Sequence, residues 1–367
     1  MSCAIRVLVL ATYPELGAST RYRVLQYVPL LAEEGIALDV KPFLSNQAFA
    51  GLYDKRHRVQ SAMGVLAGIG RRTLDMFGLG SYDLVFVQRE AALLGPPVIE
   101  WLACRRVPLV LDLDDATYLD RPSDVYGPMV DALKWPGKAR RLIDWSDHVV
   151  CGNPEIAAYV ARQQVPATVI PTVVDIDRYG PRGSRQPGDL VTGWIGTHST
   201  FVYFRTLVPA LRRLASLHRF TVAVVGAGSG EAPLDGLAAE MRPWRLDREL
   251  EDLHSFDIGV YPIADEQWAL GKSGFKAVLY MACGIPFVAS PVGVVAQMGL
   301  PGVTHLEART EDEWVAALSR LLSDAALRAE MSRKAREYAV KHFSVQRSAK
   351  MLGDVFRRTL AASHGTR

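Results

Sequence analysis

Cysteine is scarce in this sequence, and the few cysteines are widely spaced. Cys3, Cys104, Cys151 and Cys283 form no Cys-x-x-Cys pair among the 367 residues. Structural zinc sites need closely spaced ligands, and disulfide-rich folds need many more bridges for their length. The spacing therefore argues against both kinds of site and fits a protein of the reducing cytoplasm.

Long apolar runs and an excess of one charge are also lacking. No uninterrupted apolar stretch reaches the ~20 residues that a membrane-spanning helix needs. The first residues do not combine a basic segment with an apolar one, so we expect no signal peptide. Lysine and arginine number 42 against 39 aspartate and glutamate, a net charge of +3. This excess is too small to indicate a nucleic-acid partner.

The length and the hydrophobic pattern predict two α/β domains. A chain of 367 residues exceeds one hydrophobic core. Short apolar runs alternate with helix-length amphipathic segments, which is typical of βα units around a parallel sheet. A stretch rich in proline, glycine and charge, 179–190, interrupts the alternation and is typical of a linker. The predicted strands are 5–11, 36–41, 83–88, 108–113, 148–152 and 167–172 before it, and 191–196, 220–226, 257–262, 286–290 and 302–306 after it.

The C-terminal part predicts a series of helices. Thr310 and Glu313 form a capping box before an amphipathic helix, and two further amphipathic helices follow over 325–342 and 345–362. Near the other end, Pro29 is expected to kink or shorten the helix that begins near Tyr22. In such folds ligands bind beyond the carboxyl ends of the strands. We therefore expect the site in a cleft between the two halves.

The loop after the first predicted strand is one candidate for anion binding. Gly17 allows close backbone approach, and Arg21 and Arg23 stand at the start of the next helix. Arginine forks match phosphate or carboxylate, although the same arginines are equally well explained as solvated surface charges. A Gly-x-Gly-x-x-Gly pattern is missing here, which argues against a dinucleotide-binding site.

Carboxylates gather after the strand 108–113. Asp112, Asp114 and Asp115 follow one another within four residues, and Arg89 and Glu90 stand just past the preceding strand. The aspartates predict hydrogen bonds to sugar hydroxyls or to a cationic acceptor, a metal site of Asp-x-Asp type, or capping of the next helix. Arg89 and Glu90 are predicted either to pair with each other or to contact a ligand.

The second half opens on a glycine-containing strand–helix junction. Gly193, Gly196, Thr197 and His198 lie in it. The backbone amides there could cradle a phosphate, with His198 near the chemistry, or the histidine could be structural.

The stretch 271–293, GKSGFKAVLYMACGIPFVASPVG, is the strongest single signal. Lys272 and Lys276 flank the start of a buried helix. A lysine at a helix N-terminus opposes the macrodipole, so a bound anion would make this placement favourable. The alternative is a solvated charged face. We assign both lysines to a diphosphate, and we assign Ser273 and the preceding Asp265 and Glu266 to nucleotide or sugar contacts.

These stretches together resemble the family 4 glycosyltransferases. The residues that carry the resemblance are 281–293, with 257–262, 169–175 and 193–200 around them. The resemblance covers nearly the whole chain. It implies the GT-B fold, in which two Rossmann-like domains face a central cleft and a C-terminal helix crosses back to the first domain. It places an acceptor domain at 1–180, a nucleotide-sugar domain at 190–343 and the returning helix at 344–367.

The chain departs from that family at the donor site. Members often have two glutamates eight positions apart, and these positions are Gly271 and Leu279 here. An arginine usual after the first C-terminal strand is replaced by Thr197, and no lysine follows nearby. A histidine common in the family corresponds to Asp114. The resemblance is therefore to a divergent branch, in which Lys272 and Lys276 replace the usual cations.

The resemblance implies a retaining transfer of a sugar from a nucleotide-sugar donor, without metal or other cofactor. Lys272, Lys276, Arg21 and the amides of Gly196 and Thr197 would hold the donor phosphates, and Gly193 would contact the nucleotide or sugar. Catalytic roles fall to three residues and acceptor contacts to three more. These are Asp114, Asp115 and His198 for catalysis, and Gly17, Arg23 and Arg89 for the acceptor.

Several functional alternatives stay open at this point. The acceptor is a glycan, a lipid-linked group or a small metabolite. A non-catalytic nucleotide-sugar-binding protein also fits, because the two glutamates are missing. An epimerase or a phosphorylase on the same fold is a third possibility.

Two stretches leave contact with a membrane open. Residues 53–77 have basic ends around an apolar middle, and residues 133–141 add a tryptophan and four positive charges. Such segments either rest on anionic lipid or form an amphipathic helix that covers the N-terminal sheet. We expect a cytoplasmic monomer or homodimer, with peripheral contact to the inner face of the membrane as the open alternative.

Overall fold

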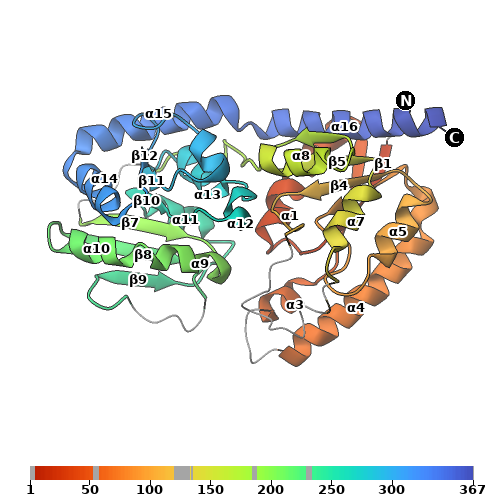
Figure 1. The fold of residues 1–367 in the computed structure, drawn as a ribbon, viewed down its shortest axis with the longest axis horizontal. Helices are drawn as coiled ribbons and strands as arrows, with labels where there is room; N and C mark the ends of the chain where they lie inside the picture. The colour runs from red at the N-terminus through yellow and green to blue at the C-terminus, as the bar shows by residue number, and fades with distance from the viewer. Residues whose placement is uncertain are drawn as a thin grey trace. The chain divides into compact units, whose positions relative to one another are not determined.

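The computed structural model describes residues 5–52, 58–119, 133, 135–183, 188–228 and 234–366. The chain divides into two compact units. Unit 1 comprises Met1–Val173, Gly271–Ser273 and Val345–Arg367, and unit 2 comprises Val174–Leu270 and Gly274–Ser344. Both units are α/β, and each contains one six-stranded sheet (Figure 1).

Unit 1 is built on a parallel sheet with the strand order β2-β1-β3-β4-β5-β6. The central strands are buried along their whole length, because both faces of the sheet are covered. The strands are β1 (Ile5–Ala11), β2 (Ile36–Pro42), β3 (Leu84–Gln88), β4 (Leu109–Leu113), β5 (His148–Cys151) and β6 (Ala167–Val169).

The helices of unit 1 include the last helix of the chain. Helix α16 (Val345–Thr366) packs on α2 and β5, and the Phe356 ring lies edge-on to Phe86 of β3 at 5.3 Å between ring centroids. The other helices are α1 (Ala18–Arg23), α2 (Val28–Glu33), α3 (Asn46–Gly51), α4 (Arg58–Phe77), α5 (Val98–Cys104), α7 (Lys138–Asp144) and α8 (Pro154–Ala161).

Unit 2 repeats the architecture with the parallel strand order β12-β11-β10-β7-β8-β9. Its strands are β7 (Leu190–Ile195), β8 (Phe220–Val225), β9 (Ala239–Arg242), β10 (Ile258–Tyr261), β11 (Phe287–Ala289) and β12 (Leu306–Glu307). Its helices are α9 (His198–Arg205), α10 (Val208–Ala215), α11 (Glu249–His254), α12 (Gln267–Leu270), α13 (Phe275–Ala282), α14 (Glu311–Ser323) and α15 (Ala325–His342).

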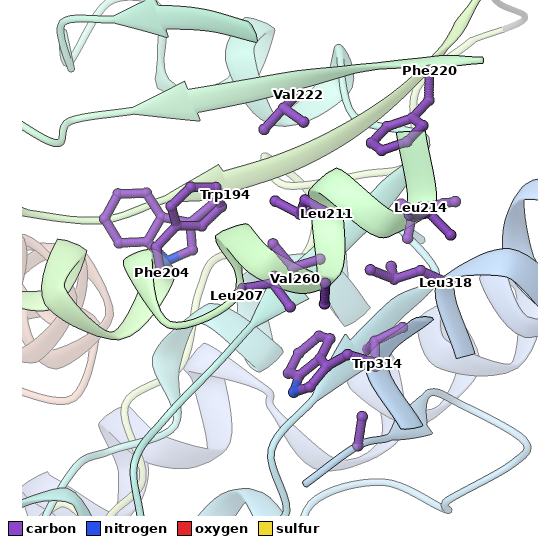
Figure 2. Close-up of a cluster of buried hydrophobic side chains, with 14 of the residues drawn as sticks. Trp194, Phe204, Leu207, Leu211, Leu214, Phe220, Val222, Val260, Trp314 and Leu318 are labelled. Atoms are coloured by element: carbon purple, nitrogen blue, oxygen red, sulfur yellow. The ribbon is translucent and has the colours of Figure 1, made fainter. Parts of the chain in front are cut away.

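The core of unit 2 lies between its sheet and the helices α10 and α14. Figure 2 shows Leu207 and Leu211 facing Val222 and Val260 of the sheet, with Trp314 from α14 beside them. All of these side chains are less than a tenth exposed. Helices α10 and α14 also pack on each other and so share this core.

Most of the predicted elements are confirmed, including several helix ends. The Thr310 hydroxyl accepts from the Glu313 amide at 3.2 Å, and the Glu313 carboxylate accepts from the Thr310 amide at 3.1 Å, which confirms the capping box. Pro29 lies in the first turn of α2, after a 3₁₀ turn that separates α1 from α2. The predicted long helix is therefore broken, as proline requires.

Three features of the fold differ from the prediction. Of the predicted strand 302–306 only Leu306 lies in a strand, β12, and the residues before it form a turn closed by an isolated bridge between Pro301 and His305. Strand β9 escaped prediction because its sequence, Ala-Glu-Met-Arg, is short and half polar. The chain also enters unit 2 at Val174, before the predicted linker. The Tyr179 hydroxyl donates to Glu249 at 2.7 Å, and Arg182 forms an ion pair with Asp257, so the first part of that stretch is bound to unit 2.

Candidate functional site

The sheet of unit 2 has one topological switch point, between β10 and β7. From β7 the order runs outward through β8 and β9 on one side and through β10, β11 and β12 on the other. In open parallel sheets the loops diverge above such a point and leave a crevice at the carboxyl ends of the strands, where ligands bind. The loops that follow Ile195 and Tyr261 are therefore the first place to look for a site.

Lys276 occupies this switch point. It lies in the first turn of α13, and its ammonium stands 4.9 Å from the centroid of the Tyr261 ring and 5.4 Å from that of Trp194. Trp194 belongs to β7 and Tyr261 to β10, and both rings are almost fully buried. Cation–π attraction to two rings holds the half-buried ammonium in place. The arrangement presents one oriented positive charge at the start of a helix.

The glycines of the β7–α9 junction serve the packing of unit 2. A Cβ on Gly193 would lie 2.0 Å from the Phe256 ring, and one on Gly196 would lie 2.5 Å from the Trp194 ring. Gly226 has φ +82°, and a Cβ there would lie 2.2 Å from the Gly196 carbonyl oxygen. Only residues without a side chain allow these backbones to approach so closely. The ligand contacts assigned to Gly193 and Gly196 stay predictions.

The two amides predicted to cradle a phosphate already have partners within unit 2. The Gly196 amide donates to the Val225 carbonyl at 3.0 Å, which extends the β7–β8 ladder. The Thr197 amide donates to the Thr200 hydroxyl at 3.2 Å in the capping box of α9. His198 follows as the first residue of α9 and is half-buried. The geometry therefore favours Lys276 over these amides as the anion-binding group.

Asp265 and Glu266 take different positions after β10. The Tyr203 hydroxyl of α9 donates to the Glu266 carboxylate, which ties the loop to that helix. Asp265 is exposed and lines a pocket of about 270 Å³ at the carboxyl ends of β10, β11 and β12. Ser290, Arg309 and Glu311 add polar groups to the same pocket, and Trp314 adds an apolar wall. This pocket could hold a polar ring, with Asp265 as the acceptor of hydrogen bonds.

Unit 1 gathers charged side chains at the carboxyl ends of β3 and β4. The Arg89 Nε lies 3.8 Å from Asp114 Oδ1, and the guanidinium stands 5.9 Å from the centroid of the Tyr13 ring. Arg89 has φ +65°, a left-handed conformation that is costly for a residue with a side chain. Burial lowers the pKa of Arg89, but the charges of Asp114, Asp115 and Glu90 together with Tyr13 raise it overall. Glu90 forms an ion pair with Lys138 at 2.9 Å. Arg89 and Glu90 therefore each have a charged partner other than the neighbouring residue.

The predicted aspartate cluster separates into three roles. Asp112 is bound to Arg23. Asp114 keeps one buried oxygen, Oδ1, for which no described residue supplies a hydrogen bond. Asp115 accepts from the Ala116 amide at 3.0 Å, and burial raises the pKa of its carboxyl, although Lys272 and Arg89 oppose the shift. A buried acceptor that lacks a donor fits a ligand hydroxyl, and a carboxyl with a raised pKa fits proton transfer.

The short segment Gly271–Ser273 lies with unit 1, although the residues on either side of it lie with unit 2. The Asn153 side-chain amide donates to the carbonyls of Gly271 at 2.9 Å and Lys272 at 3.0 Å. A Cβ on Gly271 would lie 2.2 Å from that of Ala116, so the approach is close. Lys272 and Ser273 therefore lie near Asp115 and the rest of the unit 1 cluster, whereas Lys276 belongs to unit 2.

Asn153 has two roles in unit 1. Its Oδ1 accepts from the Ile156 amide at 2.9 Å and so caps α8. Its second role, as the anchor of Gly271 and Lys272, joins residues 118 and 119 positions apart. No local pattern signals such a contact.

The arginines of the first loop mainly hold the protein together. Arg21 Nη1 donates to the Glu15 and Leu16 carbonyls at 2.9 and 3.0 Å. Arg23 is 2% exposed and donates to both Asp112 oxygens and to the Ile170 carbonyl. Burial lowers the pKa of Arg23, but its contacts with Asp112 raise it overall. A Cβ on Gly17 would lie 2.6 Å from that of Tyr13. The phosphate and acceptor contacts assigned to Arg21, Arg23 and Gly17 stay predictions that this geometry does not favour.

Part of unit 2 is similar to a known protein family. Residues 191–324 match the family described as "Glycosyl transferases group 1". The matched range begins at β7 and ends after α14, so it contains the switch point and Lys276.

Curated relatives carry the name of a glycosyltransferase. The D-inositol 3-phosphate glycosyltransferase of Saccharomonospora viridis is 30% identical over 254 residues, which are 62% of this chain and 58% of that relative. The D-inositol 3-phosphate glycosyltransferase of Mycobacterium marinum is 30% identical over 250 residues, or 60% of this chain and 52% of that relative. The chain thus matches between half and three fifths of the length of these relatives.

Solved structures share the architecture over the whole chain. A sucrose-phosphate synthase from Thermosynechococcus elongatus has a TM-score of 0.69 at 15% identity. The superposition covers 98% of this chain and 100% of the synthase chain. Likeness at this level of identity shows the fold. The chain has the predicted GT-B fold, with two parallel six-stranded sheets.

Proposed function

We propose that this protein is a glycosyltransferase that moves a sugar from a nucleotide-sugar donor to an acceptor hydroxyl with retention of configuration. The observation that carries the proposal is Lys276, fixed over the Trp194 and Tyr261 rings at the switch point of unit 2. The match of residues 191–324 to a glycosyltransferase family supports the same reaction class. Retention and independence from metal are proposed from the resemblance to family 4.

Lys276 would act on the leaving group. When the bond between the anomeric carbon and the phosphate oxygen breaks, negative charge develops on the nucleoside diphosphate. A cation already in position stabilises that charge without reorganisation during the reaction, which is usually the largest contribution of a protein to such chemistry. The two aromatic rings provide this preorganisation, because they hold the ammonium before the donor arrives.

The unit 1 cluster would hold the acceptor. Asp114 Oδ1 is a buried acceptor of hydrogen bonds that suits an incoming hydroxyl, and Arg89 orients that carboxylate from 3.8 Å. The acceptor oxygen forms the new bond to the anomeric carbon, and its proton passes to the departing phosphate or to Asp115. In either route the proton has an acceptor. Asp115 suits the second route because the pKa of its carboxyl is raised.

The decisive variant is Lys276→Ala, with UDP-, GDP-, ADP- and dTDP-sugars as the donor panel. A donor is first chosen by the rise in melting temperature, since a ligand at a hundredfold excess over Kd stabilises by about 2.7 kcal/mol. We expect Lys276→Ala to lower kcat/KM for that donor by about 100-fold, the size of effect seen when one charge-stabilising group is lost.

Two further variants sharpen this test. Lys276→Arg keeps the charge and stacks on aromatic rings, so it should recover part of the activity. Lys334→Ala removes a lysine from the exposed side of α15 in the same unit and should leave the rate unchanged. Activity of Lys276→Ala within twofold of wild type would reject the proposal. Donor binding without any transfer or hydrolysis would favour a non-catalytic nucleotide-sugar-binding protein.

A further inference from the structure

Helix α4 has an unusual inward face. A surface helix normally turns its large apolar side chains toward the core. The inward side of α4 carries few of them and includes Gly64, whose Cβ would lie 2.4 Å from that of Ala48, and Gly68, whose Cβ would lie 2.7 Å from the Phe43 carbonyl oxygen. The helix thus approaches its neighbours through small residues.

The same inward side buries an arginine completely. Arg72 is fully buried, and its guanidinium donates to the carbonyls of Ala91 at 2.7 Å and of Ala11 and Lys41 at 2.9 Å. It also forms an ion pair with Asp75 at 3.0 Å. These bonds fix the rotation of α4, because turning the helix would leave the guanidinium buried without acceptors.

Val65 and Met76 pack inward on unit 1, but five other large apolar side chains of α4 face away from it. We call the surface formed by Val59, Met63, Leu66, Leu74 and Phe77 the α4 outer face. Each of these side chains is 65–82% exposed. At 100° per residue they fall within a sector of about 80°, so they lie along one side of the helix, with Gly70 between Leu66 and Leu74. Helix α4 therefore packs on unit 1 with one side, as the amphipathic-helix alternative predicts, and presents a second apolar side to the surface. Residues 53–57 of that stretch lie outside the described residues.

The exposed charged side chains described on α4 and at the end of α5 are arginines. Within Arg58–Phe77 the only acidic residue is Asp75, which is paired with the buried Arg72. Arg71 is exposed on the same helix, and its guanidinium also donates to the Phe43 carbonyl at 2.7 Å. Helix α5 packs against α4, and there the Arg105 guanidinium lies 4.2 Å from the centroid of the half-exposed Trp101 ring. Tryptophan and arginine of this kind are typical of the boundary between lipid and water.

We propose that the α4 outer face inserts into the head-group region of an anionic lipid bilayer. An interfacial helix needs an apolar stripe and cationic flanks but no great length of apolar sequence, and α4 meets both conditions. No helix among the described residues is long and apolar enough to cross a bilayer, so contact through this face would be peripheral. The proposal concerns binding alone and stands whether or not the proposed transferase activity is correct.

A second copy of the chain is a less favourable partner. A two-fold interface brings the same patch of both copies together, so the cations beside the α4 outer face would meet their own copies. Like charges at such an interface repel, whereas anionic lipid neutralises them. Charge complementarity therefore selects the lipid surface.

The test is flotation of the full chain with vesicles at low and moderate salt. One set of vesicles is phosphatidylcholine alone, and the other contains about one third phosphatidylglycerol. We expect wild type to float with the anionic vesicles, less so at the higher salt, and only weakly with phosphatidylcholine. The double variant Met63→Glu with Leu66→Glu should lower the vesicle-bound to free ratio by about tenfold or more.

A matched control places the same charges elsewhere. Leu217 and Val340 of unit 2 are 64% and 52% exposed, so Leu217→Glu with Val340→Glu adds two glutamates at comparable apolar positions. This control should bind vesicles within about twofold of wild type, corrected for net charge by the salt series. Melting curves of all three proteins show whether the variants are folded.

Three results would overturn the proposal. One is wild-type protein that floats with neither kind of vesicle at either salt concentration, a result that needs no variant. Another is equal loss of binding in the α4 variant and the unit 2 control. The third is sedimentation of wild type as a dimer that Met63→Glu with Leu66→Glu converts to a monomer, which would assign the α4 outer face to a second copy.

Discussion

Several buried polar side chains in this protein have their hydrogen-bonding capacity used by the chain itself. Arg23 binds Asp112 and Arg72 binds three backbone carbonyls, so both arginines stabilise unit 1. Removing Asp112 alone would leave a buried guanidinium without its counter-charge, which typically costs about 3–5 kcal/mol. The side chains that suit a ligand are those with a buried acceptor to which no described residue donates a hydrogen bond. Asp114, through its Oδ1, is one of them.

His305 predicts how the stability of the protein depends on pH. Its ring is stacked on Phe287 at 5.0 Å between centroids and is 1% exposed. Burial lowers the pKa of His305 from 6.5 to about 4 in the folded protein. The unfolded chain therefore binds a proton first as the pH falls, and stability is lost progressively from pH 6.5 down to pH 4.

The size of this effect can be measured with one variant. Between about pH 7.5 and pH 5.0 the difference in proton binding at His305 should cost about 2 kcal/mol of unfolding free energy. Urea titrations at the two pH values should show that His305→Phe loses less stability than wild type over the same interval. Equal losses in both proteins would mean that His305 is not the group responsible.

At the scale of the elements, the turns at the carboxyl ends of β7 and β8 depend on glycine. Gly226 combines φ +82° with a close backbone neighbour, because a Cβ there would lie 2.2 Å from the Gly196 carbonyl oxygen. Gly236 has a similar φ of +79° but nothing within 4 Å of its Cβ position. The two residues therefore separate the cost of backbone conformation from the cost of a steric clash.

We expect Gly236→Ala to cost about 1 kcal/mol, the usual penalty of a left-handed conformation for alanine. Gly226→Ala should cost about 3 kcal/mol or more, because a backbone oxygen cannot move aside as a flexible side chain can. Chemical unfolding of both variants measures the difference. A similar loss in the two variants would show that the β7–β8 turns can relax.

The sequence predicted the elements well where a local pattern decides them. Thr310 with Glu313 marked a helix start, and the buried strands were visible as short apolar runs. Lys276 could be placed at a helix start for the same reason. The Trp194 and Tyr261 rings beside it could not, because two strands far apart in sequence supply them. Which side of α4 faces the core could not be predicted either, because carbonyls distant in sequence that accept from Arg72 decide it.

At the scale of the whole molecule, the two units are interleaved along the chain. Unit 1 contains residues from the beginning, the middle and the end of the sequence. Its last helix, α16, contributes Phe356, which is fully buried. Unit 1 therefore depends on residues that follow unit 2 in the sequence.

Replacing one aromatic residue in each unit tests whether the units unfold separately. Phe356→Ala should destabilise unit 1 by about 3–5 kcal/mol, and Phe204→Ala, at a fully buried site of unit 2, should do the same to unit 2. Calorimetry should show that each variant lowers a different transition. If both lower one shared transition equally, the units unfold as a single cooperative body.

The interleaving also limits how this gene can be recombined with its relatives. Transplanting the continuous stretch 174–344 from a homologue would exchange Gly271–Ser273 as well. That tripeptide is bonded to Asn153 and closely packed on Ala116, both of which remain from the host. A chimaera needs two additional splice points that restore the host tripeptide, so that the foreign stretch is inserted as two pieces rather than one.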